Sequence, residues 1–387
     1  MNELNGGKLD WNEIREQFPI SSNEIVQFNS GSSGTMPIAV QKELMELIKT
    51  MNAMPPYEAL DMWENERSRT KERIASMLGV TKEELAFVRN TTEGLNNVLM
   101  GLPLKKDDEV ICSNVDYPYP IYSINQRVER EGIQKVEVQL DLMQNSNEEI
   151  VEAYKNAITD KTKLILLTHM THREGHILPI SKICDMAHAN GVEVLVDAAH
   201  SFAHVEHTIS EFGCDYYATS LHKWLNAPHG TGLLYVAKSK IPKIFPLSPS
   251  DKKQNDNMVK FEYIGTRSFA HELGIGPALE FLEITGLTAK QEHLHALKKY
   301  WTDKVKNLKN VQLHSNTSQD KSCAIASFQI IGKSAGAILN QFEKEFKLHL
   351  KATGYKGEVG FLRVSPNIFT SYNNLDRLVD AIRITSN

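Results

Sequence analysis

One lysine of the sequence lies in a setting that favours covalent chemistry. Lys223 stands between His222 and Trp224, directly after the apolar and aromatic run at 216–218. Partial burial near other cationic groups lowers the pKa of a lysine, and the neutral amine is then able to form a Schiff base. A solvated surface lysine is the alternative interpretation of this segment taken alone.

An aspartate and two threonines follow other expected strands. Asp197 ends the apolar run 192–196, where a buried carboxylate is costly unless it meets a cation or strong hydrogen-bond donors. Thr91 and Thr92 follow the apolar segment 85–88, and free N–H groups at the start of a helix there would favour an anion such as phosphate. Simple helix capping is the alternative for each position.

Together, these three features match the requirements of pyridoxal phosphate. A lysine holds the aldehyde of this cofactor as a Schiff base, and an acidic residue keeps its pyridine nitrogen protonated so that the ring withdraws electrons. The third requirement is a cradle for the phosphate, which Thr91 and Thr92 would supply. The combination is far more specific than Lys223 or Asp197 alone.

The elements that must position these residues alternate along the chain. Short apolar runs at 85–88, 110–112, 136–140, 164–167 and 192–196 alternate with amphipathic helical segments. This rhythm predicts an α/β fold, with a mostly parallel sheet that carries helices on both faces. From about Gly274 the pattern changes to long helices and shorter strands. We therefore expect an N-terminal segment at 1–27 packed on the small domain, a large cofactor-binding domain at 28–268 and a small C-terminal α+β domain at 269–387.

Composition narrows the function classes. The 387 residues carry a formal net charge of −5, which argues against the basic surface of a nucleic-acid-binding protein. No apolar run reaches the roughly 18 residues that span a bilayer, and the first residues lack the apolar core of a secretory signal. The four cysteines are scattered, as expected of buried thiols in a reducing compartment. We therefore expect a cytoplasmic protein that acts on a small molecule, without a nucleic-acid or membrane partner.

The chain resembles the fold type I pyridoxal-phosphate enzymes of aminotransferase class V, which include cysteine desulfurases and isopenicillin N epimerase-like proteins. The most specific segments are VDAAHS at 196–201, SLHKW at 220–224 and GTGLLYV at 230–236. The resemblance implies an aspartate aminotransferase-like fold, with Lys223 as the Schiff-base lysine, Asp197 as the partner of the ring nitrogen and His200 beside the phenolic oxygen of the ring. It also implies phosphate contacts from Thr91, Thr92, Ser220 and His222.

Further positions carry roles by the same resemblance. Tyr117 matches the residue whose ring stacks on the cofactor, although a core tyrosine is the alternative. Gly265 and Thr266 match an element that reaches the phosphate of the partner subunit, which implies a homodimer. Arg363 matches the arginine that binds the α-carboxylate of an amino-acid substrate.

The sequence also departs from its relatives. Desulfurases carry a nucleophilic cysteine shortly before the carboxylate arginine, and the segment 350–360 contains none; we expect Cys323 to be a core residue. The pattern thus favours transamination or epimerisation at the α-carbon, with a C–S lyase or a selenocysteine or cysteine desulfurase-like enzyme lacking the loop cysteine as the alternative.

A second departure lies at 171–173, close to the expected substrate position. Thr171, His172 and Arg173 are candidates for recognition of an additional acidic group or for acid–base chemistry, and an exposed charged loop is the alternative. The histidines at 169, 172 and 176, and at 200, 204 and 207, raise a rival hypothesis of a metal hydrolase, although neither spacing matches an established metal motif. A non-enzymatic regulatory subunit is disfavoured, because Lys223, Asp197 and Arg363 are all present.

Overall fold

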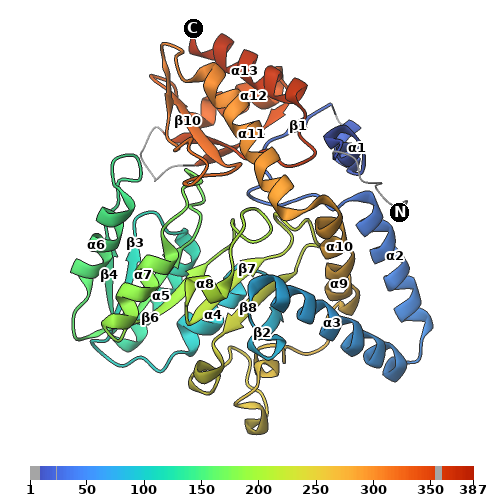
Figure 1. Cartoon of the computed structure of the whole chain (residues 1–387), viewed down its shortest axis with the longest axis vertical. Coiled ribbons are helices and arrows are strands. Elements are labelled where there is room, and N and C mark those ends of the chain that lie inside the picture. The colour runs from blue at the N-terminus through green and yellow to red at the C-terminus, as the bar shows by residue number, and fades with distance from the viewer. Residues whose placement is uncertain (1–8, 23, 354–359) are drawn as a thin grey trace.

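The computed structural model describes residues 9–22, 24–353 and 360–387 of the chain. Figure 1 shows a large lobe built on a seven-stranded sheet and, at the top of the view, a small lobe built on a four-stranded sheet. Residues 1–8 of the predicted N-terminal segment, and residues 354–359 of the predicted loop before Arg363, lie outside the described residues.

The large sheet is mostly parallel. Its strand order is β2-β8-β7-β6-β5-β3-β4, and the strands from β7 to β4 run parallel to one another, whereas β8 is antiparallel to both β2 and β7. This arrangement confirms the predicted α/β class. The strands are β2 (Leu85–Val88), β3 (Glu109–Ser113), β4 (Gln134–Val138), β5 (Thr162–Thr168), β6 (Glu193–Asp197), β7 (Tyr216–Ser220) and β8 (Gly232–Val236).

Both faces of the large sheet are covered, because alternate residues of its strands enter two separate hydrophobic clusters. Leu195 packs with α4 and α5 on one face, while Val194 and Val196 pack with α3, α6, α7 and α10 on the other. The central strands are therefore apolar along almost their whole length. The helices of this lobe are α2 (Ile38–Ala53), α3 (Pro56–Leu78), α4 (Thr91–Gly101), α5 (Pro118–Glu131), α6 (Asn147–Ala157), α7 (Ile180–Ala189), α8 (Ile209–Phe212), α9 (Phe269–Leu273) and α10 (Ile275–Thr285).

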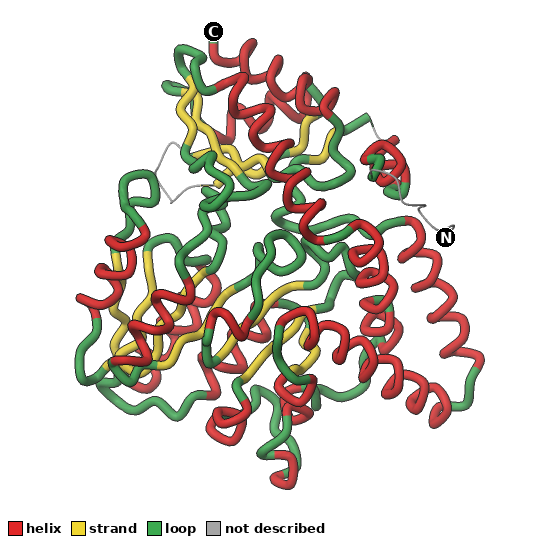
Figure 2. Tube along the Cα trace, viewed as in Figure 1, coloured by secondary structure: helices red, strands yellow, loops and turns green. Residues whose placement is uncertain are grey.

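The small lobe packs three helices on an antiparallel sheet of order β12-β13-β10-β9 (Figure 2). A separate pair joins β1 and β11 in parallel. The elements are β9 (Val311–Leu313), β10 (Ala326–Ile330), β11 (Leu348–His349), β12 (Lys351–Thr353), β13 (Phe361–Val364), α11 (Leu287–Val305), α12 (Ala335–Glu345) and α13 (Tyr372–Ser386). The N-terminal elements are α1 (Trp11–Glu16) and β1 (Val26–Gln27).

The contacts of the chain ends bear on the domain division. The Trp11 ring stacks on His293 of α11 with ring centroids 4.0 Å apart, and β1 pairs with β11, so the N-terminal segment touches the small lobe. Helices α9 and α10, which follow residue 268, pack against α2 and α3 of the large lobe. The division at 27/28 and 268/269 stays a prediction.

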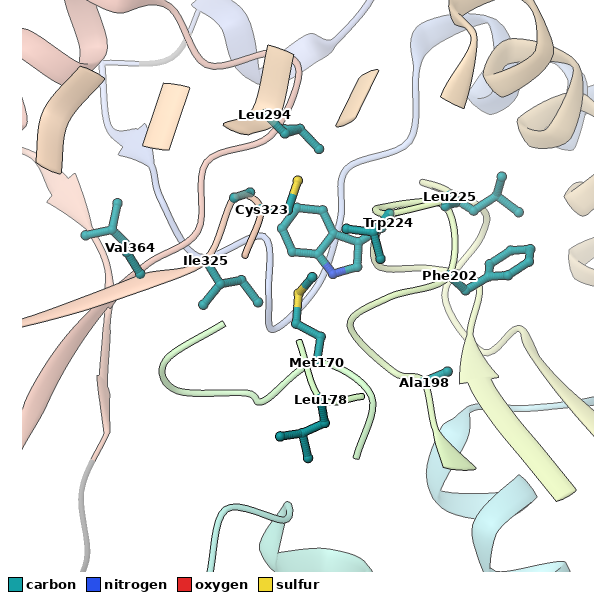
Figure 3. Packing of buried hydrophobic residues seen from close by; sticks show 14 of the residues in the cluster. Met170, Leu178, Ala198, Phe202, Trp224, Leu225, Leu294, Cys323, Ile325 and Val364 are labelled. Carbon is teal, nitrogen blue, oxygen red and sulfur yellow. The ribbon is translucent and has the colours of Figure 1, made fainter. Parts of the chain in front are cut away.

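A shared hydrophobic core joins the two lobes directly behind the residues expected to do chemistry. Figure 3 shows Trp224 among Met170 of the large lobe and Cys323 and Ile325 of the small lobe, with Val364 nearby. The Trp224 ring also stacks on His204 with centroids 3.6 Å apart. Removing a buried tryptophan of this kind costs about 3–5 kcal/mol, so this packing holds the backbone beside Lys223 firmly.

Two further features concern location and thiols. No helix among the described residues is both long and apolar enough to cross a membrane. All four cysteines lie in the described part of the chain, and each is buried and unpaired.

Candidate active site

A cavity of about 850 Å³ opens between the carboxyl ends of the large-sheet strands and strands β12 and β13 of the small lobe. This is the edge at which open parallel sheets bind ligands. Eleven of the predicted site residues line it: Thr91, Thr92, Tyr117, His172, Arg173, Asp197, His200, Ser220, His222, Lys223 and Arg363.

Three predicted residues do not line the cavity. Thr171 is fully buried, and its hydroxyl accepts a hydrogen bond from the His176 backbone at 3.0 Å, so it shapes the turn instead of facing a substrate. Gly265 and Thr266 are exposed on the surface of the chain. A contact with a partner subunit therefore stays a prediction for these two residues.

Asp197 sits at the carboxyl end of β6, level with Thr168 of β5 and Ala218 of β7. Its side chain is 4% exposed and accepts a hydrogen bond from the Ala199 backbone at 2.9 Å. Burial raises the pKa of Asp197, and the positive charge of Lys223 partly offsets that effect. Among the described residues this carboxylate has no ion-pair partner within 4 Å, which leaves it suited to a cationic donor from a ligand.

Lys223 lies in the loop after β7 and lines the same cavity as Asp197. Burial lowers its pKa to about 8, while Asp197 raises the pKa and Arg363 lowers it further. The loop leaves no room beside it: a Cβ on Gly34 would lie 2.0 Å from the Lys223 carbonyl oxygen and 2.8 Å from that of His222. The Gly34 N–H donates to the His222 carbonyl at 2.9 Å. Close backbone approach and the Trp224 packing together position the lysine.

Polar groups gather at the N-terminus of α4. The Ser220 hydroxyl lies 2.6 Å from the Thr91 hydroxyl and 3.0 Å from the Thr91 backbone nitrogen, while the Asn90 side chain caps the helix by accepting from the Glu93 backbone at 2.9 Å. His222 lies beside this group, and burial lowers its pKa to about 4. Hydroxyls, backbone N–H groups and the positive end of the helix dipole make this an anion site.

Aromatic rings form another wall. Tyr117 is 38% exposed, and its ring contacts His172 edge-on with centroids 5.1 Å apart and stacks on Tyr119 at 5.4 Å. His200 is buried, its Nδ1 has no partner among the described residues, and burial lowers its pKa well below the ordinary value. An unpartnered buried nitrogen at the cavity wall is open to a polar group of a ligand.

Arg363 of the small lobe and Arg173 of the large lobe both line the cavity and carry positive charge. Arg363, in β13, is 4% exposed and donates to the His172 carbonyl, the Asn29 side chain and the Ser32 hydroxyl, each at 2.9 Å. Arg173 lies 3.3 Å from the Glu174 carboxylate and donates to the Asn114 carbonyl at 3.2 Å. Glu174 therefore partly neutralises the charge of Arg173, whereas no carboxylate among the described residues forms an ion pair with Arg363.

Sequence reasoning missed several residues of the site. Asp116 ties two strand ends together, because its carboxylate accepts from the backbone and hydroxyl groups of both Ser113 and Thr168. Asn29 and Ser32, which accept hydrogen bonds from Arg363, were assigned no role from the sequence. Lys351 also lines the cavity. It lies in strand β12, which the sequence pattern did not reveal.

The rival metal hypothesis has no support from side-chain grouping. No three His, Cys, Asp or Glu side chains gather in a metal-binding arrangement within residues 9–22, 24–353 and 360–387. The predicted candidates have other contacts: His169 packs edge-on against Phe212, while His204 donates from Nδ1 to the His200 carbonyl and accepts at Nε2 from the Ala324 N–H.

Comparison with known proteins decides the family. The profile of the family Aminotransferase class-V matches residues 25–378. The chain belongs to the aminotransferase class V family. It is 25% identical to an isopenicillin N epimerase of Streptomyces clavuligerus, over 96% of this chain and 98% of the relative. It is 27% identical to a probable cysteine desulfurase of Halalkalibacterium halodurans, over 83% of each chain.

The fold is likewise shared with solved structures. One is a variant of the cystine C–S lyase C-DES with glycine covalently linked to its pyridoxal-phosphate cofactor, with a TM-score of 0.87, 20% identity and coverage of 97% of this chain and 99% of that one. The chain is thus a class V enzyme of the pyridoxal-phosphate-dependent kind.

The side chains of the cavity fit pyridoxal 5′-phosphate. Asp197 is a buried carboxylate without a cationic partner among the described residues. The His200 Nδ1 is a buried nitrogen without a hydrogen-bond partner among those residues. The Thr91–Ser220 pair offers hydroxyls at a helix N-terminus, and Lys223 has a lowered pKa. These are the chemical types that the ring nitrogen, phenolic oxygen, phosphate and aldehyde of this cofactor require.

Proposed function

We propose that this class V enzyme acts at the α-carbon of an amino-acid-type substrate, by transamination or by epimerisation of the isopenicillin N epimerase kind. The observation that carries this proposal is a single cavity that holds a lysine of lowered pKa, a buried aspartate and an arginine with no carboxylate partner among the described residues. The relative named isopenicillin N epimerase, which aligns over almost the whole chain, supports the same class of reaction.

Each residue has a distinct task in this proposal. Arg363 binds the substrate carboxylate through its guanidinium and so orients the α-carbon. Bound pyridoxal phosphate supplies an electron-withdrawing ring that stabilises negative charge at that carbon. Asp197 would accept a hydrogen bond from the ring nitrogen and keep that nitrogen protonated. Lys223 would hold the aldehyde of the cofactor, and its amine is the group that would move a proton.

The free Lys223 amine then moves a proton at the substrate α-carbon. Its pKa of about 8 places it near neutrality, where an amine both accepts and returns a proton efficiently. Return of the proton to the opposite face of the α-carbon would give epimerisation, and with the cofactor bound the same lysine would also support transamination. With the cofactor bound, Tyr117 would contact its ring, and Thr91, Thr92, Ser220 and His222 would hold its phosphate.

A persulfide-forming desulfurase is disfavoured. No cysteine is among the residues that line the cavity, and the segment 350–360 holds none in the sequence. Cys323 is fully buried in the core between the lobes, and burial raises the pKa of its thiol to about 12. A nucleophilic cysteine needs the opposite, an exposed thiol of lowered pKa. C–S bond cleavage without a protein thiol stays the second candidate, supported by the relatives named cysteine desulfurase.

The assembly and location belong to the proposal as well. We propose a cytoplasmic homodimer in which Gly265 and Thr266 of one subunit reach the phosphate site of the other. The exposure of both residues on the single chain supports this assignment.

Deuterium exchange separates the outcomes. The purified holoenzyme is incubated with single amino acids in deuterated water, and the α-position is followed by NMR. Deuterium at the α-carbon with inversion supports epimerisation, a keto acid supports transamination, and pyruvate with sulfide from cysteine or cystine supports the lyase. Wild-type protein that exchanges no amino acid, or a Lys223→Ala variant that exchanges as fast as wild type, would refute the proposal.

A further inference from the structure

The edge of the small sheet places a second cation beside Arg363. Strands β12 and β13 are antiparallel, and their register sets Lys351 directly opposite Arg363. Side chains of directly opposed residues project from the same face of a sheet, with Cβ atoms about 4.5–5.5 Å apart. Both residues line the cavity. On the other side of Arg363, the opposed residue is Ser327 of β10, whose hydroxyl donates to the Arg173 carbonyl, so this face of the sheet looks onto the large lobe.

Two positive charges in this arrangement repel each other. Like charges directly opposed on neighbouring strands are destabilising unless an anion lies between them. Arg363 is held by neutral oxygens of Asn29, Ser32 and His172, so its charge is not cancelled there. Lys351 is exposed and forms no ion pair or hydrogen bond with any residue that the structure describes.

The acidic residues that line the cavity do not neutralise Lys351. Asp116 is held by Ser113 and Thr168, and Asp197 lies at the floor near Lys223. Glu137 pairs with Lys135 at 3.2 Å. None of them forms an ion pair with Lys351, and the wall near β12 and β13 keeps unbalanced positive charge.

We propose that the substrate is an amino acid whose side chain ends in a second carboxylate, which Lys351 binds while Arg363 binds the α-carboxylate. This inference rests on the proposed function and names the substrate class of the same site. The cavity supports it, since about 850 Å³ lies toward the upper end of ordinary ligand pockets and leaves room for a side chain beside the cofactor. The half-exposed Tyr119 and Tyr122 line the same cavity and offer packing for the apolar part of that side chain.

The test compares matched ligands on matched variants. Glutamate and glutamine differ in the distal charge, so the ratio of their kcat/KM values for α-carbon deuterium exchange reports recognition of that charge. We expect wild type to favour glutamate. Lys351→Gln should reduce the ratio about three- to tenfold, which is the effect of losing an ion pair that is partly shielded from water. Lys344→Gln is the control, because Lys344 is an exposed lysine of the same lobe that does not line the cavity.

A binding measurement keeps this inference separate from the proposed chemistry. Glutarate carries two carboxylates and butanoate one, and the affinity of the holoenzyme for each is measured by calorimetry. We expect glutarate to bind more tightly, with the advantage lost in Lys351→Gln and kept in Lys344→Gln. If the enzyme exchanges amino acids but Lys351→Gln leaves the preference for glutamate over glutamine unchanged, the second carboxylate site is overturned and the proposed function stands. Lys351-dependent glutarate binding without exchange of any amino acid overturns the proposed function and supports the second carboxylate site.

Discussion

Replacing Arg363 with lysine tests how the substrate carboxylate is held. The Arg363 guanidinium already donates three hydrogen bonds of 2.9 Å to His172, Asn29 and Ser32. A lysine keeps the charge but has no planar fork, and its three donors cannot serve these oxygens and a carboxylate together. Loss of one charge-assisted hydrogen bond to the substrate costs about 1.5–3 kcal/mol, which corresponds to a rise of about 10- to 150-fold in KM.

The assay compares the amino acid that exchanges best with the amine that lacks its α-carboxylate. We expect Arg363→Lys to raise KM for the amino acid while kcat changes little, because the contact is made in both the ground state and the transition state. The amine should bind wild type and variant equally. Arg383→Lys, an exposed substitution on α13, controls for general effects. Equal loss of affinity for the amine and the amino acid would refute the carboxylate role of Arg363.

Three further predictions concern the cofactor. Because the pKa of Lys223 is lowered to about 8, its amine becomes neutral at lower pH than an ordinary lysine. The rate at which the apoenzyme captures pyridoxal phosphate should therefore rise with pH and level off above about pH 8. A rate that keeps rising toward pH 10 would contradict this prediction. Gly34→Ala, whose Cβ would meet the Lys223 carbonyl at 2.0 Å, should weaken cofactor retention at least tenfold in equilibrium dialysis, whereas Gly336→Ala, with open space around it, should not. Thr266→Ala should weaken cofactor retention several-fold in a dimer; unchanged retention would remove Thr266 from the phosphate site.

The sequence predicted the large lobe well because its signals are local. Apolar runs of strand length and their flanking helices are read directly from the chain, and Gly79 ends α3 in the left-handed conformation as expected of a glycine there. The small lobe was harder. Strand β12 has three residues and β11 two, and segments this short carry too few residues for a period to show.

The site residues likewise fall into those that the sequence could predict and those that it could not. Lys223, Asp197 and Thr91 could be found from the sequence because each lies at or beyond the carboxyl end of a strand of the mostly parallel large sheet, where ligand sites gather. Lys351 could not be found from the sequence, because its meaning depends on a cross-strand register with Arg363 that links two strands of the small lobe. Thr171 was expected near a substrate from its position in the chain, but its hydroxyl turns inward to the His176 backbone. Side-chain direction in a loop of this kind is set by tertiary contacts.

The identity of the lysine that binds the cofactor tests the proposed active site most directly. The holoenzyme is treated with borohydride, which makes the lysine–cofactor bond permanent, and the digested protein is mapped by mass spectrometry. We predict a single modified peptide, carrying the cofactor on Lys223, and no such peptide from Lys223→Ala. Four other lysines have a lowered pKa and lie outside the cavity, and they serve as internal controls: Lys71, Lys260, Lys290 and Lys298. Modification of one of these, with Lys223 unmodified, would contradict the account.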